Sequence, residues 1–243
     1  SYYYLEGMQT AYSESGGSPF ISSVQADFKQ KFKAGILTAG AKLTYRSNDI
    51  YHQFYEGGEY SDAFSNDLLH TELIPAAYVL FSSKIGKKFT YKAGLRGEFS
   101  TVTLTSSHEG LDVRNNDFFV SPSLSGTLRL AENQDLSLAF SRRVGRPAYP
   151  QLNPYMSMVD ATTYEQGNMH LRPEKSSKLD FSYNFRSSKV QIFADAYMNY
   201  TTDYISQITK ISDGLLITTY INGTSDLKTG ADLSFKLVPA KWM

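Results

Sequence analysis

A regular alternation of apolar and polar residues constrains the fold of this chain more than any other feature. Apolar residues occupy every second position from Leu179 to Phe185, and polar residues lie between them. After the short connection Ser187-Ser188, the alternation resumes from Val190 to Tyr200. Successive side chains on a β-strand point to opposite faces, so each segment has one apolar face and one polar face. The pair predicts a two-faced β-hairpin.

The same pattern recurs along most of the chain and predicts about ten strands. The runs reach roughly ten residues, whereas strands of soluble domains average about five to six. About ten residues is the length that a tilted strand needs to cross a bilayer. An apolar band facing lipid and a polar lumen give this pattern. The alternation therefore predicts an all-β fold, an antiparallel up-and-down transmembrane β-barrel. The other alternating segments are Val24–Phe32, Leu37–Tyr45, Phe89–Phe99, Phe118–Leu130, Leu136–Phe140 and Leu233–Leu237.

The connections are expected to alternate in length. Short turns are predicted near positions 34, 86, 133 and 187, and long connections at 47–70, 106–116, 143–173 and 206–220. Outer-membrane barrels have short periplasmic turns and long extracellular loops. We expect Gly16-Gly17-Ser18-Pro19 to break the first strand and Asp112–Asp117 to form a polar turn. The facing of Glu72–Phe81 stays open, because this stretch is more uniformly apolar.

Composition excludes several classes of protein. The chain has 24 basic and 24 acidic residues, which argues against a nucleic-acid partner. It has no Cys, so no thiolate chemistry is expected. Its 18 Tyr suit the boundary between water and hydrocarbon. No apolar run is long enough for a transmembrane helix.

One stretch resembles a known family. The segment from Phe140 to Phe185 is similar to the barrel of TonB-dependent outer-membrane receptors, in particular the Bacteroidetes-type outer membrane β-barrel family. Asn199–Leu237 resembles the same family. Met169 departs from the pattern, because the family usually has Pro there. The motif residues are Arg146, Pro147, Leu152, Asn153, Pro154, Gly167, Asn168, Leu171, Pro173 and Glu174.

The resemblance implies a larger protein in the bacterial outer membrane. Such receptors have a plug domain and a barrel of about twenty-two strands. We therefore expect residues 1–243 to be a partial β-barrel domain without a plug domain. The chain shows no signal peptide and ends on Met243, and we interpret it as a segment of a longer chain. Expected partners are outer-membrane lipid and, through the parent chain, the plug and a TonB-type energy-coupling protein. The transported ligand would be a small molecule or glycan, such as a metal chelate, cobalamin or an oligosaccharide.

Aromatic residues in the predicted loops are the candidates for ligand contact, although they could equally pack the loops. They are Tyr51, Phe54, Tyr55, Tyr149 and Tyr155. Four prolines lie in the region 144–173, and proline interrupts both helices and β-ladders. A stiff segment of this kind could fold inward to contact a plug or ligand, or could be a structural corner of the barrel.

Catalytic and metal-binding patterns are missing from the sequence. We expect His52, His70, His108 and His170 to lie in loops, and none has metal-ligand spacing. Neither a GxSxG motif nor a phosphate-binding glycine loop occurs. We therefore expect no cofactor, no metal and no enzymatic activity. Two alternatives stay open, a soluble β-rich binding module and a membrane β-barrel hydrolase. The charges predicted to face the lumen could pair with one another or line a ligand path; they are Lys92, Arg96, Glu98, Arg129, Asp195, Asp232 and Lys236.

Overall fold

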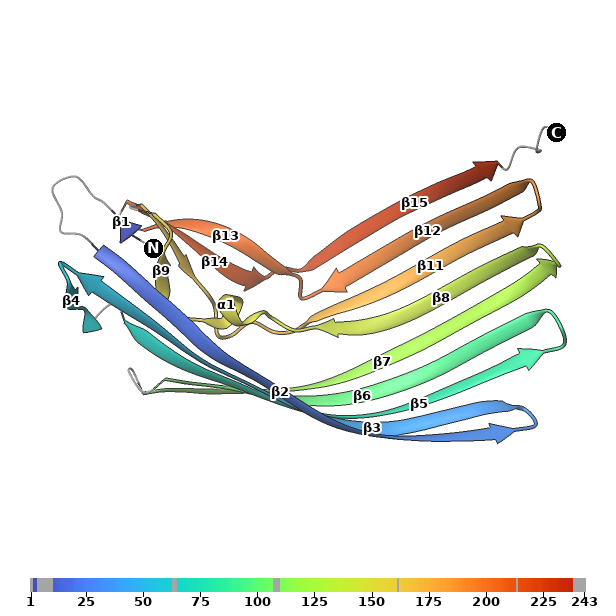
Figure 1. The fold of residues 1–243 in the computed structure, drawn as a ribbon, viewed down its shortest axis with the longest axis horizontal. Helices are drawn as coiled ribbons and strands as arrows, with labels where there is room; N and C mark the ends of the chain where they lie inside the picture. Colours follow the sequence, from blue (N-terminus) through green and yellow to red (C-terminus); the bar gives the residue numbers. More distant parts are fainter. Residues whose placement is uncertain are drawn as a thin grey trace, which may run out of the picture.

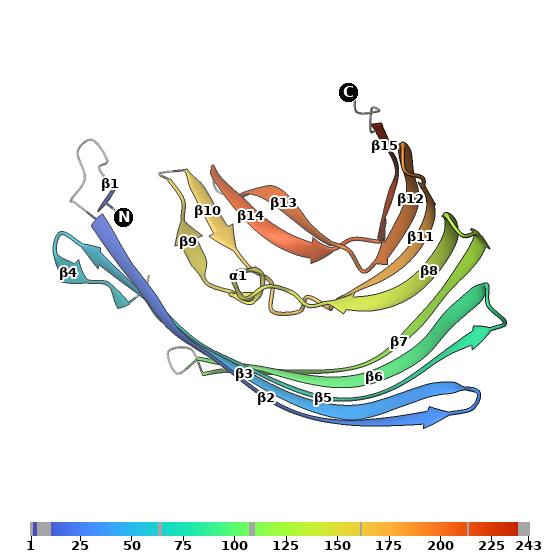
Figure 2. The same cartoon turned by 45° about the vertical axis from the view of Figure 1, so that its right-hand side comes forward.

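The fold is a strongly curved antiparallel wall (Figures 1 and 2). The computed structural model describes residues 2–3, 11–62, 65–106, 110–160, 162–212 and 214–237. Neighbouring strands follow the order β1-β2-β3-β5-β6-β7-β8-β11-β12-β15, and β4 pairs with β3. The wall strands are β1 (Tyr2–Tyr3), β2 (Ala11–Phe32), β3 (Gly35–Glu56), β4 (Glu59–Tyr60), β5 (Asn66–Ile85), β6 (Phe89–Ser106), β7 (Leu111–Ala131), β8 (Gln134–Gly145), β11 (Glu174–Arg186), β12 (Val190–Thr202) and β15 (Ser225–Leu237).

A smaller layer lies on the concave side of this wall (Figure 2). It has the strand order β13-β14-β10-β9, and a short helix, α1, precedes β9 in the chain. None of the helices in the described ranges is long and apolar enough to cross a membrane. The elements are α1 (Tyr149–Leu152), β9 (Met156–Met158), β10 (Thr163–Gln166), β13 (Ile205–Ser212) and β14 (Leu215–Asn222).

The convex face of the wall is apolar and exposed, as the alternation predicts. Leu124, Leu138 and Phe181 are 56%, 53% and 44% exposed, so they do not belong to a dry interior between two layers. Cross-strand pairs such as Phe181 with Leu138 place these side chains on one face. A belt of this kind suits hydrocarbon outside the wall and polar groups inside it.

The facing of the segment 72–81 is now defined. Leu73 and Val79 are each 43% exposed on the convex face. Glu72, Ile74 and Ala76 are buried on the concave face. The segment is apolar on both faces because part of its concave face is also covered.

Strands extend into several segments that were predicted to be loops or turns, so those predictions were wrong about where the strands end. The ladder between β3 and β5 continues through Ser47–Thr71 to His52–Asn66, which leaves only residues 57–65 as the connection. Gly16–Pro19 lies within β2, and Asp112–Asp117 lies within β7 rather than in a turn. Pro19 is tolerated because β1 pairs only with Ala11 and Tyr12, so that β2 has no described strand on its outer side at Pro19.

The physical reason is strand length. β2 and β3 have 22 residues each. At about 3.3 Å per residue such a strand is about 70 Å long, much more than an apolar band about 25 Å tall requires. Beyond the band both faces meet water, so the alternation fades while the backbone ladder continues.

The connections differ in length between the two ends of the wall, as predicted, but two of the expected long connections were wrong. β6 ends at Ser106 and β7 already begins at Leu111, and the strands β13 and β14 occupy most of the segment 206–220. Short turns join β2 to β3, β5 to β6, β7 to β8 and β11 to β12 at one end, whereas β4, α1 and the smaller layer gather at the other (Figure 1). Within the described residues the sheet does not close. β2 has only β1 on its outer side, and β15 has a neighbour only in β12. Open edges inside a bilayer need partners, which suits a wall that is part of a larger barrel.

Candidate functional site

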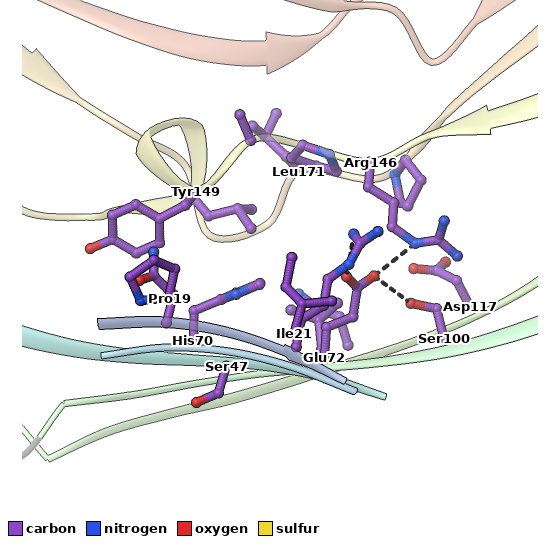
Figure 3. Close-up of a pocket in the computed structure, with 18 of the residues that line it drawn as sticks. Pro19, Ile21, Ser47, His70, Glu72, Ser100, Asp117, Arg146, Tyr149 and Leu171 are labelled. Carbon is purple, nitrogen blue, oxygen red and sulfur yellow. Dashed lines mark hydrogen bonds and ion pairs between the residues drawn. The ribbon is translucent and has the colours of Figure 1, made fainter. Parts of the chain in front are cut away.

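The connection from β8 to β11 folds onto the concave wall instead of projecting away from it. We call residues 146–173 the inner loop. Arg146 at its start contacts two strands of the wall, as the close-up in Figure 3 shows for β5. Its Nε lies 2.7 Å from Oε1 of Glu72 on β5, and its Nη2 donates to Oε2 of Glu98 on β6 at 2.8 Å. The Arg146 guanidinium therefore joins the loop to the wall at two points.

Both carboxylates have further cationic partners. The Glu72 side chain is only 4% exposed, and it accepts hydrogen bonds from Arg46 at 3.1 Å and from the Ser100 hydroxyl at 3.2 Å. Glu98 also accepts a 2.5 Å bond from Nε of Arg96. A buried carboxylate is tolerated when it is paired and hydrogen-bonded. We call Arg46, Glu72, Arg96, Glu98 and Arg146 the clasp.

The inner loop is closed by its own backbone. The Gly167 N–H donates to the Asn153 carbonyl, and the Asn168 N–H donates to the Gln151 carbonyl, each at 2.7 Å. The backbones approach so closely at Gly167 that a Cβ there would lie 2.5 Å from the Asn153 carbonyl oxygen. Only glycine fits at this crossing. This explains the glycine of the Gly-Asn pair in the sequence motif.

A small apolar cluster attaches the inner loop to the wall. Leu152 and Leu171 from the loop pack with Leu68 of β5 and Leu104 of β6, and all four are at most 5% exposed. The Met169 carbonyl accepts a 3.2 Å bond from the Asn115 side chain of β7. The Met169 side chain also packs against the cluster, so Met169 contributes apolar contact as well as a carbonyl, which proline would also have.

The other end of the motif joins the inner loop to the smaller layer. The Asn168 amide donates to the Tyr220 carbonyl at 3.0 Å, and Glu174 accepts a 2.7 Å bond from the Ile205 N–H.

The three prolines of the motif lie at different places in the inner loop. Pro173 is buried, and Pro147 lines the adjacent cavity. Pro154 accepts a 2.8 Å bond from the Gln166 side chain through its carbonyl. The motif residues therefore form the inner loop and hold it against the wall and the smaller layer.

A cavity of about 390 Å³ lies between the inner loop and the wall (Figure 3). The wall contributes mainly polar side chains, and the loop contributes Pro147, Tyr149 and Leu152. Burial raises the pKa of Tyr149 to about 12, so its hydroxyl resists ionisation even at alkaline pH. The space combines charged, hydrogen-bonding and aromatic groups, which suits a small polar ligand or the side chains of a protein partner. The polar wall residues are Arg46, Asn48, His70, Glu72, Ser100, Asn115 and Asp117, whereas the side chain of Ser47 points away from the cavity (Figure 3).

The structure brings together only part of the predicted aromatic set. Tyr149 lies at the cavity with its ring 6.3 Å from that of His70. Tyr155 lies on the inner loop and donates to the Ser106 hydroxyl at 2.6 Å. Phe54, on the concave face of β3, is 8% exposed and so is not open to a ligand.

The other two aromatic candidates lie on the convex face of β3. Tyr51 is 41% exposed there. Tyr55 stacks on Tyr12 with 4.5 Å between ring centroids and meets Tyr60 edge-on. Neither can reach the cavity, and ligand contact by any of the five remains a prediction.

Sequence reasoning missed Arg46 and Glu72 of the clasp. A signal was present, because Glu72 is the one charged residue in the otherwise apolar stretch 72–81. Of the charges predicted for the lumen, Arg96 and Glu98 belong to the clasp. Arg129 faces Asp135 at 3.7 Å in an exposed pair, which contributes little to stability.

The predicted positions of the histidines were partly wrong. His52 lies in β3 and His70 in β5, and His170 lies in a turn as expected. His108 is outside the described residues. Across the described part of the chain, no group of three His, Cys, Asp or Glu side chains is placed to hold a metal ion.

Comparison with known proteins shows what the wall is similar to. A sequence profile of the outer membrane protein β-barrel family matches residues 5–243. No curated protein matches the sequence. The fold is similar to the copper transporter OprC, with a TM-score of 0.72, 16% identity, and coverage of 96% of this chain and 36% of that one.

Two further solved structures share the fold. The ferric-catecholate import receptor Fiu from E. coli K12 has a TM-score of 0.66 and 12% identity, over 93% of this chain and 36% of that one. The ferric yersiniabactin uptake receptor FyuA from Yersinia pestis has a TM-score of 0.61 and 16% identity, over 97% and 35%. The chain thus spans about a third of the length of these transporters and receptors. The resemblance to a barrel segment of TonB-dependent receptors is confirmed.

Proposed function

The chain belongs to the outer membrane protein β-barrel family, and we propose that it is the part of a TonB-dependent receptor wall that takes part in ligand binding and uptake. Its location is the bacterial outer membrane. The plug domain and the contact with a TonB-type energy-coupling protein would come from the rest of the parent chain.

The observation that carries this proposal is the inner loop held by the clasp on the concave wall. A loop that only connects two strands does not need to be fixed to the wall. Here one guanidinium, that of Arg146, fixes the loop by contacting two largely buried carboxylates. Held in this way, the loop narrows the interior and leaves a cavity whose wall side is mainly polar and whose loop side is largely apolar and includes the aromatic ring of Tyr149. Such a fixed constriction suits a pore that must hold a ligand or plug before transport.

The ligand class follows from the cavity and from the similar structures. Arg46, Asn48, Asp117 and Tyr149 offer hydrogen bonds of both polarities. Chelated metal ions present oxygen-rich, charged surfaces that such groups recognise, and the similar structures are described as handling copper or ferric chelates. A ferric chelate is therefore our first candidate, with cobalamin and oligosaccharides next. We propose no catalytic role, and the concave wall is assigned to binding alone.

Uptake by cells tests the proposal. A strain that carries the complete receptor and a strain with the gene deleted would be given labelled ferric siderophore, hemin, cupric ion, cobalamin and an oligosaccharide in turn. One tracer should accumulate only in the first strain, and a protonophore should abolish that accumulation. The variant Asp117→Asn should raise the concentration for half-maximal uptake, whereas Ser137→Ala, on the concave face of β8 away from the cavity, should not.

Equal accumulation of every tracer in both strains would contradict the uptake role. Hydrolysis of phospholipid or peptide substrates by the purified receptor would favour a membrane hydrolase. A chain that stays folded and monodisperse in buffer without detergent would favour the soluble binding module.

A further inference from the structure

The strands β7 and β8 separate toward the end of the wall that lies opposite the short turns (Figure 1). A notch on the convex side of the wall lies at this separation. The ladder between the two strands runs from Ala131–Gln134 to Ser123–Ser141 and then stops. The next pair would join Pro122 to Arg142, and proline has no N–H to donate to a ladder. β8 continues to Gly145 alongside β11 alone. Above Pro122, the β7 edge that faces β8 therefore has no strand partner among the described residues.

The notch has an apolar side and a cationic side. Its volume is about 210 Å³. Phe118 and Val120 of β7 are 67% and 46% exposed on the convex face. Arg142 and Lys175 come from β8 and β11, across the gap. The lining residues are Phe118, Phe119, Val120, Arg142, Val144 and Lys175.

The notch lies at the outer boundary of the apolar belt. Arg142 pairs with Ser177, and Ser177 pairs with Tyr200 on the next strand. One step toward the turns, Phe140 pairs with Leu179, which pairs with Met198. The convex face thus changes from wholly apolar to cationic and tyrosine-bearing within two residues. This is the level at which lipid headgroups meet acyl chains.

The charge at this level is positive. Arg142 is exposed and forms no ion pair with any residue that the structure describes. Lys175 and Arg172 both contact Asp203, at 3.1 and 3.0 Å. The carboxylate of Asp203 thus pairs with two of the three cations, Arg172 and Lys175, and the charge of Arg142 is not neutralised by any described residue. A net positive charge therefore remains beside the notch. An unpaired guanidinium presents a planar fork that matches the oxygens of a phosphate group.

We propose that the notch binds a phosphorylated glycolipid of the outer leaflet. Its phosphate would accept hydrogen bonds from Arg142, with Lys175 adding charge. An acyl chain would lie along Val120 and Phe118, where the missing strand leaves the apolar surface open. The family location in the outer membrane supplies this lipid at the right height, and a site that needs both an acyl chain and a phosphate favours lipid over free phosphate. The proposal does not depend on which ligand the receptor transports.

Lipid retention tests this site in the complete barrel protein. The purified receptor would be placed in nanodiscs of phosphatidylcholine with a small amount of diphosphoryl lipid A, and bound lipid would be measured by native mass spectrometry. Loss of a charge-assisted hydrogen bond of about 1.5 kcal/mol corresponds to about a tenfold weaker affinity, and we expect that loss for Arg142→Gln. Dephosphorylated lipid A should bind to the unaltered receptor about as weakly as lipid A binds to the Arg142→Gln variant.

The matched control is Arg143→Gln. Arg143 is the next residue on the same strand, carries the same charge and is also exposed, but it points to the concave side. It should retain lipid A fully. Equal losses in the two variants, no loss in Arg142→Gln, or displacement of the lipid by millimolar inorganic phosphate would overturn the proposal.

A second measurement covers the case in which the Arg142 variant fails to fold. A photo-crosslinking amino acid would replace Phe118 in the otherwise unaltered receptor in cells. It should attach to lipid A more often than the same group at Leu227, which is also exposed, at 59%, and pairs with Tyr200 on the row of residues that includes Arg142, but lies three strands from β8. Equal attachment at the two positions would contradict a defined site.

Discussion

Replacing Arg146 by Gln should release the inner loop while leaving the wall intact. Arg146 is 19% exposed and contacts Glu72 and Glu98, which are 4% and 14% exposed. Removal of one partner from a buried ion pair usually costs about 3–5 kcal/mol. Here Arg46 and Arg96 remain as partners for the two carboxylates, so we expect a smaller loss, of about 2 kcal/mol.

That loss should appear as local opening, because the ladders of the wall do not depend on Arg146. A change of about 2 kcal/mol corresponds to about a 30-fold larger open population. Hydrogen exchange at the amides of Gly167 and Asn168, which are bonded within the inner loop, reports this directly. We expect their exchange to accelerate about 30-fold, in line with that estimate, while the amides between β11 and β12 remain unchanged.

The control is Arg143→Gln, which removes the same charge from the end of β8, just before the inner loop and outside the clasp. It should leave inner-loop exchange as it is in the unaltered protein. The reasoning would be refuted if Arg146→Gln left the Gly167 amide as protected as before, or if exchange rose equally in the loop and throughout the wall.

Three further outcomes are expected. Gly167→Ala should increase proteolysis of the inner loop, with a penalty of about 2 kcal/mol from overpacking, whereas Gly223→Ala should be tolerated because its Cβ would lie 3.5 Å from the nearest atom. Leu138→Arg, on the convex belt, should lower the free energy of unfolding in bilayers by about 2 kcal/mol, and Ser137→Arg, on the concave side, should change it little. Because burial raises the pKa of Tyr149 to about 12 from 10.0, its contribution to loop packing is complete below pH 10 and is lost as the pH rises toward 12. Base catalysis speeds amide exchange at every site as the pH rises, so the quantity to compare is the protection of the inner-loop amides relative to their intrinsic exchange rate. That protection should fall over this range, and not in Tyr149→Phe.

The sequence predicts the wall where a bilayer imposes the alternation. Segments such as Leu179–Phe185 have to present one apolar face, so both strand and facing can be read from them. Above the belt that constraint disappears. The ladder from Ser47–Thr71 to His52–Asn66 is maintained by backbone hydrogen bonds, which leave no pattern in the side chains.

The candidate site was predictable only in part, for a different reason. The motif around Arg146 could be recognised, but its partner Glu98 lies 48 positions away in the chain. The contact between Arg146 and Glu98 depends on strand register and on a loop that turns inward. Neither of these can be predicted from the local periodicity of the sequence. The same holds for the notch. Pro122 marks the end of the β7–β8 ladder, and this can be recognised only when β8 is known to be the neighbour of β7.

The rows of hydrogen bonds that carry β2 and β3 beyond the belt also affect how the cell surface is recognised. Tyr12 and Tyr55 are held face to face by strands that cannot rearrange independently. An antibody raised against the folded protein would meet one fixed epitope there, and a linear peptide copied from either strand would compete poorly for it.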